Sequence, residues 1–228
     1  MTTPLPEPDL PSRHGPPGPP PVVWAMTALF AAFEIAFQLA DEGILPWPDL
    51  RFEVYVRMAF WDIYFEDSLS GRAVPVEFWT SFLTHGLLHG SMVHLLMNGV
   101  IFLSLGGMLA NGLGAVRFVA LFAVTAMTGA LFFGAIADTQ GPLVGASGAI
   151  FGFFGVLKRW EWRYIRETGA PSNRFWGTIG ALILLNVVLF FFMPGEGSLA
   201  WEAHLGGVVA GFLIAPVLAP RARGPSPI

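Results

Sequence analysis

Residues 141–155 read Gly-Pro-Leu-Val-Gly-Ala-Ser-Gly-Ala-Ile-Phe-Gly-Phe-Phe-Gly, and they are the most informative part of the chain. Ser147 follows a Pro/Gly turn and begins an apolar segment, and small neighbours leave its hydroxyl uncovered. Gly148, Gly152 and Gly155 recur at spacings of three and four, so they share one face of the expected helix. Such faces let a second membrane helix approach closely. The run therefore predicts an accessible serine on a tightly packed helix.

A second run, Ala203-His204-Leu205-Gly206-Gly207-Val208-Val209-Ala210-Gly211, supplies the candidate partner helix. It places a histidine at the start of an apolar segment, and Gly207 and Gly211 form another small-residue face. A serine hydroxyl is a weak nucleophile until a base removes its proton, and neutral histidine can serve as that base. If the two glycine faces pack together, Ser147 and His204 become a nucleophile and its base.

The composition is that of a polytopic membrane protein. Of 228 residues, 54% are hydrophobic and 12% are charged, and the mean hydropathy is +0.61. A soluble domain carries about 25% charged residues. The net charge of −4 and the scattered basic residues argue against a nucleic-acid partner. Because the chain has no cysteine, disulfides, thiolate metal sites and a cysteine nucleophile are excluded.

The apolar segments predict an all-α, six-transmembrane-helix bundle with an interfacial outer loop after the first helix. The membrane domain is expected over residues 22–220, with helices over about 22–40, 92–109, 113–136, 147–162, 175–193 and 204–218. Residues 1–21 hold nine prolines and predict a disordered cytoplasmic tail. A signal peptide is the alternative, but the leader is acidic as well as basic and Gln38-Leu39-Ala40 offers no small-x-small cleavage site, so we expect a retained helix. Residues 221–228 are expected to form a second short cytoplasmic tail.

The connection over residues 41–80 interleaves aromatic residues with acids and arginines. This pattern is typical of a segment that lies in the membrane interface, and we expect an outer helical hairpin. Glu34 lies in the middle of the first apolar segment. A carboxylate facing lipid is costly, so Glu34 is expected to face the interior as a structural hydrogen-bonding group.

Basic residues predict the orientation. Nine lie on one set of connections and three on the other, so the positive-inside rule puts both termini in the cytoplasm. The basic residues counted are Arg13, Arg117, Lys158, Arg159, Arg163, Arg166, Arg174, Arg221 and Arg223 against Arg51, Arg57 and Arg72. The charge bias and the lack of a transit peptide suggest a bacterial inner membrane.

In this orientation, the second, fourth and sixth helices all begin at the outer side. His94, Asn98, Ser147 and His204 then lie at similar depth, and polar groups within a bilayer usually carry function. Attack on a peptide carbonyl creates an oxyanion that needs preorganised donors. His94 and Asn98, spaced i,i+4, project from one helix face, and the Ser147 N–H is unpaired at a helix N-terminus.

Two further residues are candidates for orienting His204. Phe151, four residues after Ser147, could pack against the His204 ring and fix its orientation. Glu202 is a weaker candidate for a third catalytic member, because it lies just outside the sixth helix. A serine–histidine dyad is chemically feasible without it.

Structural roles for these residues remain open. A serine in a glycine-rich membrane helix usually serves packing, and Asn98 could be an interhelical hydrogen bonder. His85 and His89 suggest a metal site, but the adjacent glutamate of the zinc-protease helix and a fourth ligand are missing. We interpret both as structural, and neither a metal nor an organic cofactor is expected.

Three stretches together resemble the rhomboid intramembrane serine proteases: His85-Gly-Leu-Leu-His89-Gly-Ser-Met-Val-His94-Leu-Leu-Met-Asn98, Gly145-Ala-Ser147-Gly148 with Phe151 and Gly152, and Ala203-His204-Leu-Gly206-Gly207. The resemblance implies cleavage of membrane proteins, single-span or polytopic, within or near their transmembrane helices. It implies Ser147 as nucleophile, His204 as general base, and an oxyanion hole formed by His94, Asn98 and the Ser147 N–H. The supporting positions are Gly145, Gly148, Phe151, Gly207 and Gly211.

The resemblance also implies a lid over residues 194–200 and a substrate gate formed by Phe190, Phe191 and Phe192. This chain departs from the family pattern at Thr80, where many members have Arg after Trp, and at Phe151, where some have Tyr. The runner-up function is a catalytically inactive rhomboid-like protein that binds and routes membrane clients. A small-solute transporter is a weaker candidate, because the spans below Asn98 and Ser147 are apolar.

Overall fold

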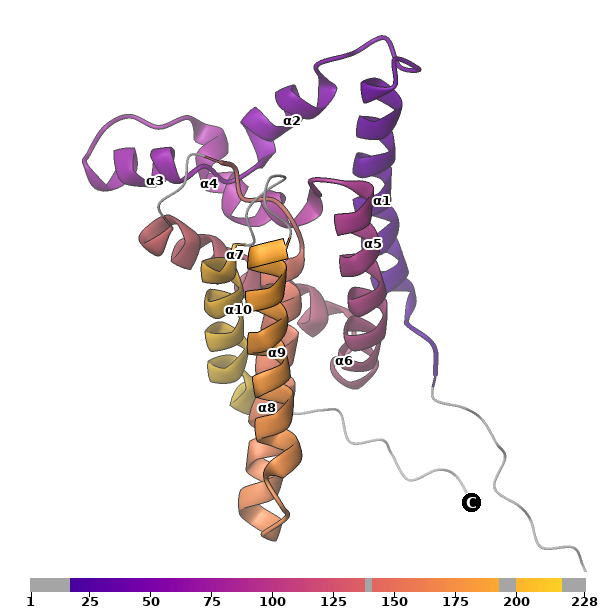
Figure 1. The fold of residues 1–228 in the computed structure, drawn as a ribbon, viewed down its shortest axis with the longest axis vertical. Helices are drawn as coiled ribbons and strands as arrows, with labels where there is room; N and C mark the ends of the chain where they lie inside the picture. Colours follow the sequence, from indigo (N-terminus) through magenta and orange to yellow (C-terminus); the bar gives the residue numbers. More distant parts are fainter. Residues whose placement is uncertain (1–16, 138–140, 193–199, 219–228) are drawn as a thin grey trace, which may run out of the picture.

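The computed structural model describes residues 17–137, 141–192 and 200–218, and these residues are almost entirely helical (Figure 1). Within them, regular pairing of strands is absent apart from one isolated antiparallel bridge between Phe60 and Leu143. The elements are α1 (Pro21–Asp41), α2 (Leu50–Met58), α3 (Asp62–Leu69), α4 (Val76–Thr84), the 3₁₀ turn η1 (His85–Leu87), α5 (Met92–Ile101), the π-helical η2 (Phe102–Gly106), α6 (Gly107–Leu113), α7 (Ala115–Ile136), α8 (Ser147–Thr168), α9 (Asn173–Phe192), α10 (Trp201–Ile214) and the 3₁₀ turn η3 (Ala215–Val217).

Three of the described helical stretches are long and apolar enough to cross a bilayer: Pro21–Asp41, Met92–Leu113 and Ala115–Ile136. The stretch Trp201–Val217 is a shorter apolar helix. With α8 and α9 alongside, the chain is a polytopic all-α membrane bundle, which confirms the predicted fold class.

Several helix limits differ from the expected ones, for local reasons. The second predicted helix continues through the π-helical turn and α6 to Leu113, and Gly114, with φ of 83°, separates it from α7. The fourth extends to Thr168 instead of residue 162. Beyond its apolar part, Arg163 pairs with Glu167 one turn on at 2.7 Å, and such i,i+4 pairs stabilise an exposed helix. Gly169, in the left-handed region, then ends it.

Residues 41–80, expected as an interfacial hairpin, form three short helices, α2, α3 and the start of α4. These helices lie together at the end of the bundle that we call the upper end, as drawn in Figure 1. Phe60 anchors the segment, because it is fully buried and its ring lies 6.3 Å from that of Phe133 on α7 and 5.8 Å from that of Phe78 on α4.

The centre of the bundle is α8, which packs against α10 and α7. A Cβ atom at Gly207 would overlap the carbonyl oxygen of Gly148, and one at Gly211 would overlap that of Gly152. The two backbones are therefore in direct contact along the glycine faces. Such close approach is possible only without side chains at these positions.

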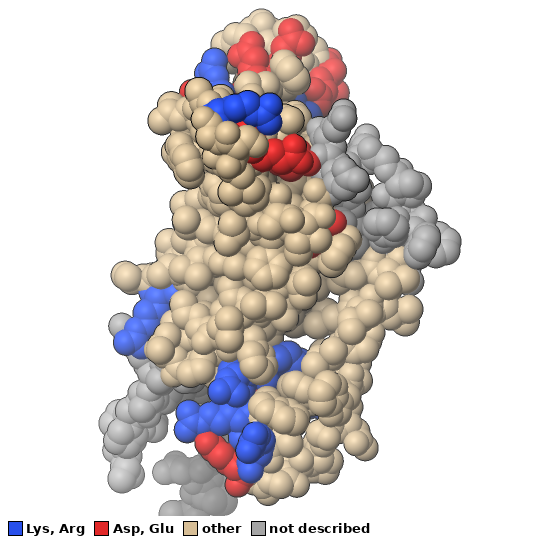
Figure 2. All heavy atoms as spheres, turned by 90° about the vertical axis from the view of Figure 1, so that its left-hand side faces the viewer, with Lys and Arg blue, Asp and Glu red and all other residues tan. Residues whose placement is uncertain are grey.

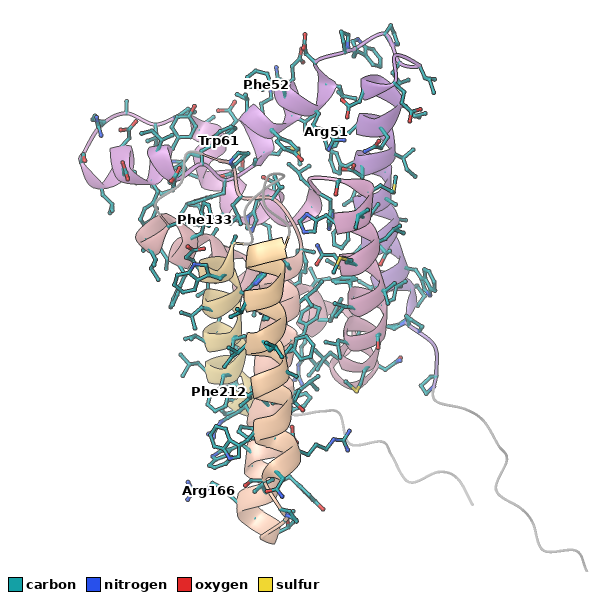
Figure 3. All side chains as sticks on the ribbon, viewed as in Figure 1. Arg51, Phe52, Trp61, Phe133, Arg166 and Phe212 are labelled. Carbon is teal, nitrogen blue, oxygen red and sulfur yellow. The ribbon has the colours of Figure 1, made fainter. Side chains whose placement is uncertain are left out.

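Charge is distributed unevenly along the long axis. Acidic side chains gather at the upper end together with some basic ones, and basic side chains predominate at the lower end, with a mainly uncharged band between the two ends (Figure 2). The lower group includes Arg159, Arg163 and Arg166 of α8. Figure 3 shows Arg51 at the upper end, Arg166 at the lower end and Phe212 of α10 between them. A band poor in charge between two charged ends fits an integral membrane protein.

Candidate active site

Ser147 and His204 meet at the contact between α8 and α10. Ser147 is the first residue of α8, and His204 lies in the first turn of α10. The distance between Ser147 Oγ and His204 Nε2 is 2.9 Å, which is a hydrogen bond. His204 is 6% exposed, whereas Ser147 is partly exposed.

Gly145 shapes the turn that leads into Ser147. Its φ of +122° is a conformation that residues with a side chain rarely adopt, and its N–H donates to the His85 carbonyl at 3.0 Å. A Cβ atom here would lie 2.7 Å from Cε1 of His94. Glycine is therefore required both by the backbone and by the neighbouring ring.

His94 and Asn98 of α5 border this turn from one side. From the position of a Cβ at Gly145, His94 Nε2 is 2.9 Å away and Asn98 Nδ2 is 3.8 Å away. His94 Nδ1 accepts from the Gly90 N–H at 3.4 Å, so the ring proton lies on Nε2. Asn98 is 6% exposed, and its Nδ2 donates to no group in the described part of the chain. Two N–H donors therefore converge near the residues that precede Ser147.

Phe151 covers one face of the His204 ring. The two ring centroids are 4.1 Å apart and the planes differ by 9°, which is a stacked arrangement. Phe151 is one turn after Ser147 on α8, so a single helix presents both the hydroxyl and the stacking ring.

The sequence did not indicate the third partner of His204. Asn186 of α9 lies with Oδ1 2.7 Å from His204 Nδ1. Glu202, the acid weighed for this place, makes no such contact in the described structure. An asparagine within an apolar span is uncommon, and this rarity could have indicated Asn186 as a candidate site residue.

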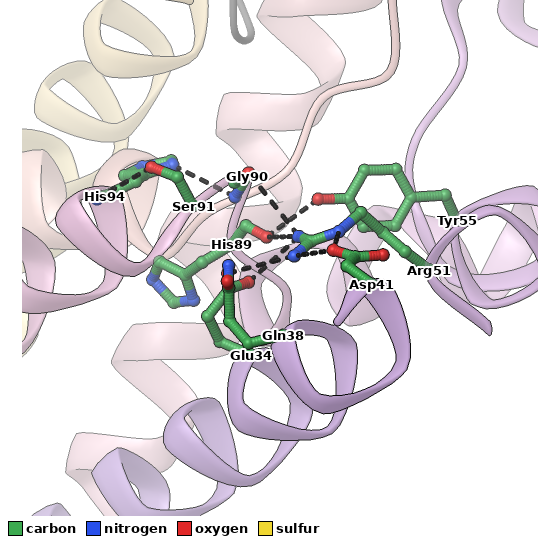
Figure 4. Close-up of polar contacts among 9 residues, drawn as sticks. All are labelled: Glu34, Gln38, Asp41, Arg51, Tyr55, His89, Gly90, Ser91 and His94. Atoms are coloured by element: carbon green, nitrogen blue, oxygen red, sulfur yellow. Dashed lines mark hydrogen bonds and ion pairs between the residues drawn. The ribbon is translucent and has the colours of Figure 1, made fainter. Parts of the chain in front are cut away.

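A partly buried ion-pair network contacts the turn before α5 (Figure 4). Glu34 of α1, fully buried, pairs with Arg51 of α2 at 3.1 Å, and Asp41 pairs with Arg51 at 2.9 Å. Arg51 also donates to the carbonyl oxygens of His89 and Gly90 at 3.3 and 3.5 Å. Burial alone would lower the pKa of Arg51, but its hydrogen bonds to the acids raise that pKa above its ordinary value.

This network connects to His94, because the Gly90 N–H donates to that ring. Tyr55 makes a further contact with this turn, since its hydroxyl donates to the His89 carbonyl at 2.8 Å. Glu34 therefore has the structural role expected of it, as part of an ion pair. The hydroxyl of Thr80, which follows Trp79, donates to the Glu77 carbonyl within its own helix.

His85 and His89 face the interior. His85 Nδ1 donates to the Ser81 carbonyl at 2.8 Å, and burial lowers the pKa of His85 to about 4, so the ring is neutral. The His89 ring lies 5.6 Å from that of Phe30 and 5.1 Å from that of His94. Within residues 17–137, 141–192 and 200–218, no three His, Asp or Glu side chains gather as a metal site would require.

An apolar groove of about 640 Å³ separates α9 from α8 and α10. The residues that line the groove include Phe151, Phe154, Leu182, Val208 and Phe212, together with His204. Residues 194–199 of the expected lid over residues 194–200, and the side chains of the expected gate, Phe190 to Phe192, lie outside the described residues.

The comparisons with known proteins identify the family. A model of the Rhomboid domain matches residues 76–221, and the chain belongs to the rhomboid family. It is 28% identical over 245 residues to RHOMBOID-like protein 5 of Arabidopsis thaliana, covering 92% of this chain and 75% of that protein. It is 31% identical over 143 residues to rhomboid protease GluP of Bacillus subtilis (strain 168), covering 61% of this chain and 26% of GluP.

A third relative is Rhomboid-like protease 5 of Toxoplasma gondii, 31% identical over 126 residues, with 55% of this chain and 14% of that protein covered. This chain thus spans three quarters of the plant relative but only about a quarter or less of the two proteases. All three relatives have names that place them with the rhomboids.

Proposed function

We propose that this protein is an intramembrane serine endopeptidase that cleaves other membrane proteins within or near their transmembrane segments. The observation that carries the proposal is the 2.9 Å hydrogen bond between Ser147 Oγ and His204 Nε2 in a membrane protein of the rhomboid family. A hydroxyl paired with a neutral imidazole is the minimal apparatus for acyl transfer.

In the proposed reaction, Ser147 Oγ attacks the carbonyl carbon of the scissile peptide bond while its proton passes to His204 Nε2. The tetrahedral intermediate collapses when His204 returns that proton to the leaving amine. A water molecule, deprotonated by His204, then hydrolyses the acyl-serine and regenerates the free hydroxyl.

The oxyanion of the intermediate would be held by three donors: the Nε2–H of His94, the Nδ2–H of Asn98 and the Ser147 N–H at the start of α8. The unpaired Nδ2 of Asn98 supports this role, because a buried donor without a partner carries a free-energy cost that a bound oxyanion would remove. Each such donor contributes about 2.7–4 kcal/mol to transition-state stabilisation.

The proposed topology puts both termini in the cytoplasm and the site near the extracytoplasmic surface of a bacterial inner membrane. The predominance of basic side chains at the lower end supports this orientation through the positive-inside rule (Figure 2). Substrates would then be cut near the outer ends of their membrane helices.

The second candidate is a rhomboid-like protein that binds membrane clients without cutting them. The likeness to RHOMBOID-like protein 5, whose name does not call it a protease, favours this reading. The presence of both Ser147 and His204 favours the enzyme.

The test is cleavage of a single-span substrate by the detergent-purified protein, together with labelling by a fluorophosphonate probe. We expect Ser147→Ala and His204→Ala to reduce both signals to background. Ser104→Ala, which removes an exposed hydroxyl from the helix below Asn98, is the matched control and should behave as wild type.

Cleavage that persists in Ser147→Ala would refute the assigned nucleophile. A wild-type protein that binds the substrate but neither cuts it nor reacts with the probe would favour the second candidate.

A further inference from the structure

Asn186 connects α9 to the proposed dyad. It lies on a helix that the apolar groove separates from α8 and α10, and most of the groove lining is apolar. Its Oδ1 nevertheless reaches His204 Nδ1 at 2.7 Å, on the edge of the ring opposite Ser147.

The orientation of the Asn186 amide is itself fixed. Its Nδ2 donates to the Leu182 carbonyl at 2.9 Å, one turn earlier on α9. The amide oxygen is therefore the atom left to face His204, and a carbonyl oxygen can only accept. It follows that His204 Nδ1 carries a proton.

This proton determines the state of the other ring nitrogen. A neutral imidazole carries one N–H, so a proton on Nδ1 leaves Nε2 with a free lone pair. Nε2 is the atom 2.9 Å from Ser147 Oγ. The hydrogen bonds from Ser147 through His204 and Asn186 to Leu182 thus all run in one direction.

We propose that Asn186 is a positioning residue for the proposed dyad: it holds His204 in the tautomer that can accept the Ser147 proton, and it accepts from the imidazolium formed when that proton arrives. The proposal rests on the function proposed above. Phe151 fixes the plane of the ring by stacking, but stacking does not distinguish the two nitrogens. Asn186 supplies that distinction.

The alternative role is purely structural, in which the hydrogen bond only ties α9 to α10. Asparagine is a known interhelical hydrogen bonder in membranes. In that case its loss would lower thermal stability, while the rate constants and the protonation pattern of the ring would stay as in wild type.

The first experiment compares Asn186→Leu, which removes the acceptor, with Asn186→Asp, which keeps an oxygen in the same place. Leu184→Ala is the control, because Leu184 lies on the same helix and is 62% exposed. For Asn186→Leu we expect kcat and the rate of fluorophosphonate labelling to fall roughly 10- to 100-fold, with KM within about twofold. Asn186→Asp should recover most of both rates, and Leu184→Ala should match wild type.

The second experiment does not depend on turnover. The chain has five histidines, and ¹⁵N NMR of their rings, with His204→Gln for assignment, reports which nitrogen of His204 carries the proton. We expect Nδ1–H in wild type and in Asn186→Asp, and loss of this fixed pattern in Asn186→Leu.

Wild-type kcat and an unchanged Nδ1–H signal in Asn186→Leu would overturn the proposal. A wild-type chain that does not react with the probe would count against the proposed function instead. The NMR comparison would then still decide whether Asn186 holds the ring.

Discussion

Gly145→Ala is the substitution whose effect follows most directly from the structure. A Cβ atom at this position would lie 2.7 Å from His94 Cε1, and ordinary contacts begin at 3.4 Å. The ring of His94 or the turn before Ser147 must therefore move by about 0.7 Å. The φ of +122° adds a backbone cost of about 1–3 kcal/mol for any residue other than glycine.

Both consequences can be measured. We expect the thermal unfolding midpoint in detergent to fall, and cleavage of a single-span substrate to fall roughly 10²- to 10³-fold, the loss typical of one displaced oxyanion donor. The activity loss should exceed what the fraction of unfolded protein explains, because the displaced ring belongs to the proposed site.

The matched control is Gly112→Ala in α6. Among the described residues, no atom outside its own helix backbone would lie within 4 Å of a Cβ atom at Gly112, and its φ is not in the positive range. Alanine there should stabilise the helix by about 0.5–1 kcal/mol and leave cleavage unchanged. If Gly145→Ala retained wild-type activity and an unchanged midpoint, the assigned geometry around His94 would be wrong.

Two other predictions concern the surroundings of the site. Arg51→Met should lower the unfolding midpoint strongly, because it leaves the fully buried Glu34 carboxylate without its cation, at a cost of about 3–5 kcal/mol. Adding Glu34→Gln should restore most of the midpoint, and a failure of this rescue would contradict the pairing. Phe151→Leu should reduce kcat roughly 2- to 12-fold through loss of stacking on His204, whereas Phe151→Tyr should keep a kcat near that of wild type. Equal losses of kcat in both variants would refute the stacking role.

Much of the fold could be predicted from the sequence because the bilayer restricts what an apolar segment can do. Long runs poor in charge must be helical to satisfy their backbone groups, so the all-α membrane bundle followed from hydropathy. The glycine spacings of residues 148–155 and 207–211 indicated which helices pack most closely, and the structure shows backbone contact between them.

Helix limits were harder to predict. The extension of α8 to Thr168 depends on ion pairs beyond the apolar run, and the division of residues 41–84 into three short helices depends on the aromatic cluster around Phe60. The sequence holds no strong periodic pattern for either effect, because both depend on contacts that form only in the folded chain.

For the candidate site, the sequence predicted most of the residues but only some of the contacts between them. Ser147, His204, His94 and Asn98 stood out because polar groups are rare in membrane helices, and Phe151 was expected against the imidazole from its helical spacing.

The pairing of Arg51 with Glu34 and that of Asn186 with His204 join residues 17 and 18 positions apart. Hydropathy and helical periodicity describe one segment at a time, so they determined the membrane helices and their polar positions. Which polar side chains from different helices share a hydrogen bond depends on how those helices rotate and translate against one another, and only the tertiary structure decided it.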